Sequence, residues 1–108
     1  MGIFTKLNEL REFEKSNLRF LLTVEDFDIV RTIGLYQERG QPLLLKQLFL
    51  EDIGSFSTLT RRLTKLREAG HVLVREHGPD RRAIALRLSP SVNKIYLAYE
   101  KLLRTRSR

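Results

Sequence analysis

The sequence contains no cysteine, only two histidines and no long apolar run. Without cysteine the chain cannot form disulfides, thiolate zinc sites or iron–sulfur clusters, and thiol-based redox sensing is excluded. Apolar stretches such as 20–22 and 43–45 are far too short to span a bilayer. The first residues do not show the basic segment followed by a long apolar run that is typical of a signal peptide. These features predict a soluble, cytoplasmic protein that does not insert into membranes.

Catalytic motifs are missing as well. The sequence has no Gly-rich phosphate loop, no nucleophile motif and no cluster of carboxylates or imidazoles at catalytic spacing. His71 and His77 would need a third ligand to hold a metal ion, and we expect a semi-buried histidine and a turn histidine instead. The sequence therefore predicts a protein that is not an enzyme and has neither a metal site nor a cofactor.

Basic residues are concentrated in the second half of the chain. The 108 residues are 42% apolar and 31% charged, a composition that predicts one compact domain. Residues 1–60 carry 7 basic and 9 acidic side chains, whereas residues 61–108 carry 13 basic and 4 acidic ones. Such an excess is typical of a footprint for a polyanion, but a solvated surface that only keeps a protein soluble has the same composition. The positions of these charges on the folded chain distinguish the two interpretations.

The spacing of apolar residues predicts helices in the first part of the chain. Thr23 is placed to cap one of them, with Asp26 three residues on as a carboxylate variant of the capping box. Ser55 is placed to cap another, and Gly70 to end it. The predicted helices cover residues 7–22, 23–40, 43–50 and 55–70.

The helix predicted over 55–70 has two different faces. Phe56, Leu59, Leu63 and Leu66 form an apolar stripe that we expect to pack inward. The opposite face is small, hydroxylated and basic, which suits a helix in a DNA major groove, although an ordinary solvent face is the alternative. The candidate DNA-contacting residues are Ser57, Thr58, Arg61, Thr64 and Lys65, with Arg62 reaching the flanking backbone.

A hairpin and a last helix follow. Residues 72–74 and 83–88 read as strands on either side of the turn residues 77–80, and apolar spacing over 92–103 predicts a helix before a basic tail. The order of helices and hairpin predicts a mostly α protein with a small β-hairpin wing. This is a winged helix-turn-helix (α+β) with additional N- and C-terminal helices.

Residues 57–90 carry a family resemblance. The stretch Ser57–Arg61 is similar to a Ser-Thr-Val-Ser-Arg opening of a recognition helix, and 66–72 to a Leu-Glu-x-x-Gly-Leu-Val exit. Asp80-Arg81-Arg82 matches an Asp-x-Arg wing signature, and 88–90 matches the Leu-Thr-x that opens the next helix. The whole segment, STLTRRLTKLREAGHVLVREHGPDRRAIALRLSP, resembles the MarR-type winged-helix transcription regulators of bacteria and archaea.

The resemblance implies roles for the tip of the hairpin. It places Arg82, assisted by Arg81, in the minor groove, where a narrow groove attracts a guanidinium. It makes Asp80 the residue that fixes the conformation of the wing, whereas a Pro-Asp pair that only forms the turn is the alternative.

The resemblance also implies a homodimer. Terminal helices in residues 1–22 and 91–108 would interlock beside the DNA-binding region 23–90, and their apolar content leaves surface for a second copy to cover. Packing of these helices on their own domain is the alternative. The candidate dimer contacts are Phe4, Leu7, Leu10, Phe13, Ile95, Tyr96, Tyr99, Leu102 and Leu103.

Together these features predict a sequence-specific regulator of transcription that binds double-stranded DNA as a dimer on a palindromic operator, associated with the nucleoid. No residue points to a particular small-molecule effector. A winged-helix module for replication, partition or phage control is one alternative, and nothing in the sequence separates it. A protein docking domain is another, and it predicts apolar residues on the outer face of the 55–70 helix.

Overall fold

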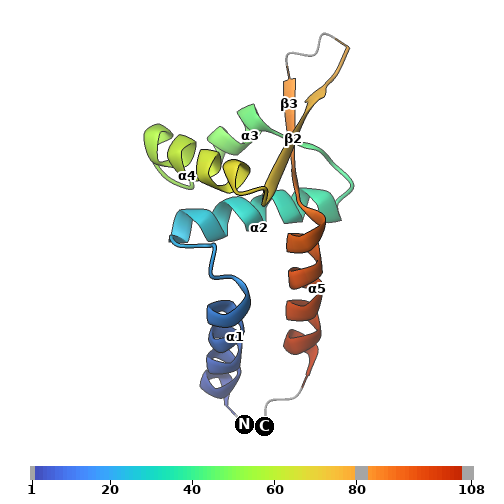
Figure 1. Ribbon diagram of the computed structural model, residues 1–108. Coiled ribbons are helices and arrows are strands. Elements are labelled where there is room, and N and C mark those ends of the chain that lie inside the picture. The colour runs from blue at the N-terminus through green and yellow to red at the C-terminus, as the bar shows by residue number, and fades with distance from the viewer. Residues whose placement is uncertain (1, 80–82, 106–108) are drawn as a thin grey trace. The chain divides into compact units, whose positions relative to one another are not determined.

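The computed structural model describes residues 2–79 and 83–105, which contain five helices and a three-stranded antiparallel sheet (Figure 1). This confirms the predicted class, mostly helical with a small sheet. Within the described residues no helix is both long enough and apolar enough to cross a membrane. The elements are α1 (Ile3–Asn17), α2 (Val24–Glu38), β1 (Leu43–Leu44), α3 (Leu45–Leu50), α4 (Phe56–Glu68), β2 (Val72–His77), β3 (Ala83–Leu88) and α5 (Pro90–Arg104).

The chain divides into two compact units. The central unit is Thr23–Ser89, and it contains α2, α3, α4 and the sheet. The terminal unit is Met1–Leu22 together with Pro90–Arg108, and it contains α1 and α5. Pro90, placed at the end of the DNA-binding region by the sequence, is the first residue of α5 and belongs to the terminal unit.

The capping box predicted for α2 is confirmed. Thr23 Oγ1 accepts a hydrogen bond from the Asp26 N–H at 3.1 Å, and Asp26 Oδ2 accepts one from the Thr23 N–H at 3.3 Å. These bonds satisfy two backbone donors that the first turn of a helix leaves without a partner. Ile29, Val30 and Ile33 are buried, and α2 packs against α4 and β3. The helix is therefore fixed at its first turn and along one side.

The sheet has the strand order β1-β3-β2 (Figure 1). Leu43 pairs with Leu86, so the helix predicted over 43–50 begins only at Leu45. The prediction was wrong here because a two-residue strand is stabilised by a partner that lies far along the chain. β2 also continues past the predicted 72–74 to His77, and it pairs with β3 from Val72–Leu88 to His77–Ala83. The two strands project beyond the helices of the central unit (Figure 1).

The terminal unit is held by contacts between α1 and α5. The Tyr99 hydroxyl donates to Glu14 Oε2 at 2.6 Å, and the Tyr99 ring meets Phe13 edge to face at 5.0 Å between centroids. Lys6 Nζ donates to the carbonyl oxygens of Leu102, at 2.9 Å, and Thr105, and so satisfies acceptors at the end of α5. The first helix covers 3–17, not the predicted 7–22.

Candidate nucleic-acid interface

The helix α4 is fixed at both ends as the sequence predicted. Ser55 Oγ accepts a hydrogen bond from the Thr58 N–H at 3.2 Å, which caps the first turn. At the other end Gly70 has a φ of 81°, a left-handed conformation that favours glycine. Leu59, Leu63 and Leu66 are buried. The capped ends and this stripe hold the rotation of α4 and therefore decide which side chains face solvent.

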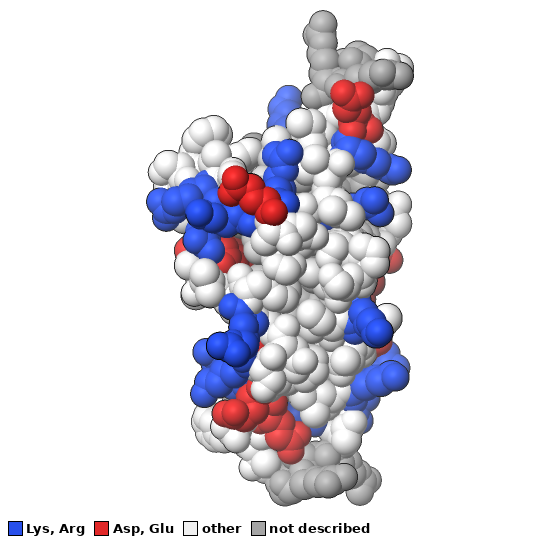
Figure 2. Space-filling view, in the orientation of Figure 1, with Lys and Arg blue, Asp and Glu red and all other residues white. Residues whose placement is uncertain are grey.

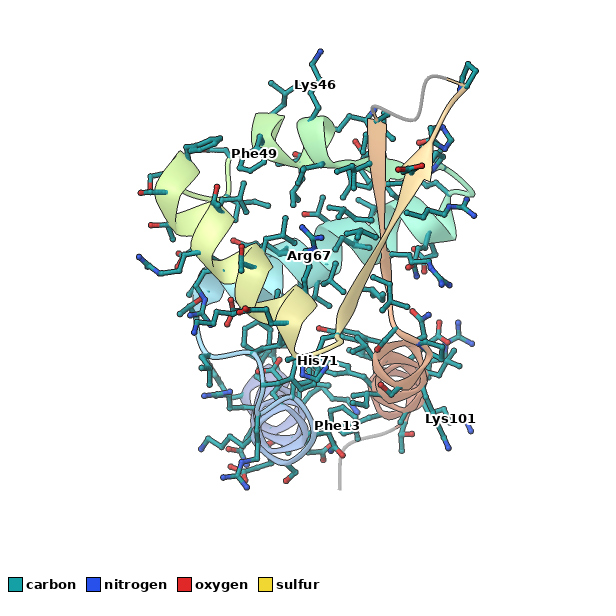
Figure 3. All side chains as sticks on the ribbon, turned by 45° about the horizontal axis from the view of Figure 1, so that its top comes forward. Phe13, Lys46, Phe49, Arg67, His71 and Lys101 are labelled. Carbon is teal, nitrogen blue, oxygen red and sulfur yellow. The ribbon has the colours of Figure 1, made fainter. Side chains whose placement is uncertain are left out.

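Phe56 does not belong to that stripe. Its side chain is 73% exposed, and its ring stacks on Phe49 of α3 with the centroids 4.9 Å apart. Leu50, at the end of α3, is 81% exposed, and Figure 3 shows Phe49 beside the start of α4. The periodicity placed Phe56 inward, but the first turn of α4 extends past the core to α3. Phe49, Leu50 and Phe56 form an exposed apolar corner.

The outer face of α4 carries the predicted hydroxyl and basic residues. Ser57, Arg61, Thr64 and Lys65 are exposed, and Thr58 is half-buried beside Ser55. Among the described residues, no ion pair or side-chain hydrogen bond engages the charged groups of Arg61 and Lys65. Lysine and arginine side chains gather over α4 (Figure 2). This face therefore presents cations that no described carboxylate neutralises.

Arg62 is the exception, and the structure corrects its assignment. Its Nε and a terminal nitrogen donate to the two carboxylate oxygens of Asp26, each at 2.7 Å. The Arg62 side chain is only 13% exposed and that of Asp26 is fully buried. Hydrogen bonding to Asp26 raises the pKa of Arg62, so this guanidinium stays charged. Arg62 joins α4 to α2, and we remove it from the candidate DNA-contacting residues.

A groove between α4 and the sheet extends the outer face of the helix. It has a volume of about 650 Å³. Arg67 lies in the space between α4 and β2 (Figure 3), and Arg87 reaches the groove from β3. The other lining residues are Thr64, Glu68, Val72, Leu73 and Val74. A basic surface therefore continues from α4 onto the strands.

Arg67 and Arg87 are not among the site residues predicted from the sequence. The signal for Arg87 was present, since it alternates with Leu86 and Leu88, which are both buried. Nothing comparable marked Arg67, because its position depends on how α4 packs against β2. The predicted wing residues Asp80, Arg81 and Arg82 lie outside the described residues, and their roles stay predictions.

The predicted dimer contacts divide into three groups. Phe4, Leu7 and Leu103 are 81%, 47% and 52% exposed. Phe13 and Tyr99 instead contact each other, and Tyr96 stacks on Tyr99 at 5.9 Å between centroids. The remaining three are partly exposed: Leu10, Ile95 and Leu102. Phe13, Tyr96 and Tyr99 therefore pack within their own unit, whereas Phe4, Leu7 and Leu103 expose apolar surface.

Within residues 2–79 and 83–105, no three His, Cys, Asp or Glu side chains are arranged to hold a metal ion. Comparison of the chain with protein-family models, with curated proteins and with solved structures finds no match. The resemblance of residues 57–90 to MarR-type regulators therefore rests on the motifs quoted above. The function has to be argued from the site itself.

Proposed function

We propose that this protein binds double-stranded DNA through the outer face of α4, as a sequence-specific, MarR-like regulator of transcription with a winged helix-turn-helix. The observation that carries the proposal is the contrast between the two sides of this helix. One side is held by buried leucines and the Arg62–Asp26 pair. The other presents Arg61 and Lys65 without described counter-charges, among short hydroxyl side chains.

The chemistry of this face matches the major groove. Ser57 and Thr64 are short, so the helix backbone can approach the bases closely, and hydroxyl groups can donate to or accept from base edges. Arg61 can donate two hydrogen bonds to guanine, and Lys65 can neutralise a phosphate. Arg61 would therefore determine the preferred base at one position, whereas Lys65 would contribute mainly salt-dependent affinity for the DNA backbone.

The hairpin would supply the second contact. Arg67 and Arg87 line the groove between α4 and the sheet, so the basic surface leads from the helix toward β2 and β3. We propose that these two arginines contact the backbone and that Arg82, assisted by Arg81, enters the neighbouring minor groove as the wing. Each phosphate neutralised in this way makes the affinity more sensitive to salt.

A homodimer would complete the regulator. No residue of α1 is buried, and Val92 is the only buried residue of α5, so these two helices have little core of their own. Exposed Phe4, Leu7 and Leu103 offer apolar surface that a second copy can cover. Two copies related by a two-fold axis would present two α4 helices to half-sites about one helical turn apart.

A protein docking domain is the second candidate function. The exposed apolar corner, Phe49, Leu50 and Phe56, favours it, because stacked aromatic rings on a surface are typical of protein interfaces. Only Phe56 of this corner belongs to α4, however, where it lies in the first turn, and the rest of the outer face of α4 is polar. Binding to DNA in replication, partition or phage control would use the same surface, and the identity of the bound sites distinguishes these roles.

Selection of bound sites from random duplex DNA tests the proposal. We expect a palindromic motif whose binding resists a scrambled competitor and weakens steeply between two salt concentrations. Arg61→Ala should weaken binding by about 1–3 kcal/mol and relax the preference at one position of the motif. Arg19→Ala is the control, because it removes the same charge from an exposed site between α1 and α2. Binding without any motif would contradict sequence-specific regulation, and no binding would favour the docking function.

A further inference from the structure

A second basic site lies on the sheet. The sheet hollow, as we name it, has a volume of about 350 Å³ and is formed between the segment after α2 and strands β2 and β3. Its charged or ionisable lining residues are Arg75, His77 and Arg87, and none of the acidic residues that the structure describes lines it. The other lining residues are Gln37, Gly40, Gln41, Pro42, Ala85 and Leu86.

The strand register explains why these groups meet. Arg75 pairs with Ala85, and Arg87 lies two positions further along β3, so both arginines project from one face of the sheet. His77 lies two positions from Arg75 along β2 and shares that face. Diagonal neighbours of this kind are about 7–8 Å apart, within reach of two arginine side chains. Ala85, which is buried, provides a small residue between them.

The two arginines have no described counter-charge. Among the described residues, neither guanidinium takes part in an ion pair or a side-chain hydrogen bond. Like charges placed as cross-strand neighbours destabilise a sheet, and an anion bound between them would remove the repulsion. A guanidinium offers parallel donors that match the oxygens of a phosphoryl group, and imidazole offers one more donor.

We propose that the sheet hollow binds a phosphoryl group, held between Arg75 and Arg87 with His77 as a further donor. The group has two possible sources. One is a phosphorylated small molecule, which is independent of the proposed function. The other is a backbone phosphate of DNA bound on α4, which rests on the proposed function and is reachable because Arg87 lines both the sheet hollow and the groove beside α4.

The first experiment titrates the protein with inorganic phosphate in the absence of DNA, at constant ionic strength set with sodium chloride, and follows the amide resonances by NMR. Saturable shifts are expected for residues 75–77 and 85–87. Arg75→Ala should weaken this binding at least tenfold, because a charge-assisted hydrogen bond is lost. Arg19→Ala is the matched control, because it removes an exposed arginine of the terminal unit that does not line the sheet hollow, and it should leave phosphate binding unchanged. Equal weakening in both variants, or weak shifts at every cation of the surface, would exclude phosphate binding in the sheet hollow.

The second experiment measures the affinity for the selected duplex as a function of salt. If the phosphate belongs to DNA, Arg75→Ala lowers the slope of log affinity against log salt by about one relative to Arg19→Ala. An unchanged slope with saturable phosphate binding assigns the site to a small molecule. An unchanged slope without phosphate binding overturns the proposal. Failure of the proposed function gives a different result: either no duplex binds, or Arg61→Ala does not change the affinity for the duplex.

Discussion

Asp26 and Arg62 show how one pair of residues can determine the orientation of a whole surface. Asp26 is fully buried, and it caps α2 while it accepts both hydrogen bonds from Arg62 of α4. A carboxylate taken out of water needs such partners, because an unpaired buried charge is very unfavourable. The pair thus fixes α4 against α2 and directs Arg61, the preceding residue, outward.

Removal of Arg62 is expected to destabilise the fold. Arg62→Ala leaves Asp26 buried without its cation, and the free energy of unfolding should fall by about 3 kcal/mol. Arg61→Ala, the neighbouring and exposed arginine, should change it by less than about 0.5 kcal/mol. Urea unfolding followed by circular dichroism measures both values. Equal effects of the two variants would show that the Arg62–Asp26 pair does not stabilise the protein.

His71 is expected to make stability depend on pH. Burial lowers the pKa of His71, so the unfolded chain binds this proton more readily than the folded protein does. The free energy of unfolding should therefore fall as the pH decreases below about 6.5. Urea unfolding at about pH 7.5 and about pH 5.5 tests this. His71→Gln should show a smaller decrease than the wild type. The same decrease in both proteins would contradict it.

At the scale of elements, the caps of α2 and α4 could be predicted because each depends on residues within one turn of the chain. Thr23 with Asp26, and Ser55 with Thr58, are such local pairs. The pairing of Leu43 with Leu86 and of Arg62 with Asp26 could not be predicted, because each partner is more than thirty positions away. The exposure of Ser57, Arg61, Thr64 and Lys65 on α4 could be predicted for the same local reason, whereas the positions of Arg67 and Arg87 beside the groove could not.

The assignment of Phe56 to the surface can be tested against a true core residue of the same helix. Leu63→Ala should lower the free energy of unfolding by about 2–5 kcal/mol, because it opens a cavity in the core. Phe56→Ala removes only the stacking contact with Phe49, so it should lower the free energy of unfolding by about 1 kcal/mol or less. Urea unfolding of the two variants provides the comparison. If Phe56→Ala lowered the free energy of unfolding as much as Leu63→Ala does, Phe56 would have to be a core residue.

At the scale of the whole molecule, we predict that two chains form a dimer through the terminal unit. Sedimentation velocity should show a mass near twice the 12.7 kDa of one chain. Phe4→Ser combined with Leu103→Ser should shift the protein toward monomer, since both side chains are exposed within one chain and would be buried between two. Circular dichroism should show unchanged helix content. A wild-type protein that is monomeric at high concentration would contradict the dimer.

The central claim is that the outer face of α4 lies on duplex DNA. The most direct measurement is an NMR titration of the protein with the selected duplex, with the amide resonances mapped onto the described residues. We predict that the largest shifts occur at Ser57, Arg61, Thr64 and Lys65, with smaller shifts along the groove at Arg67 and Arg87. Shifts confined to α1 and α5, or no saturable shift at any residue of α4, would contradict the proposed function.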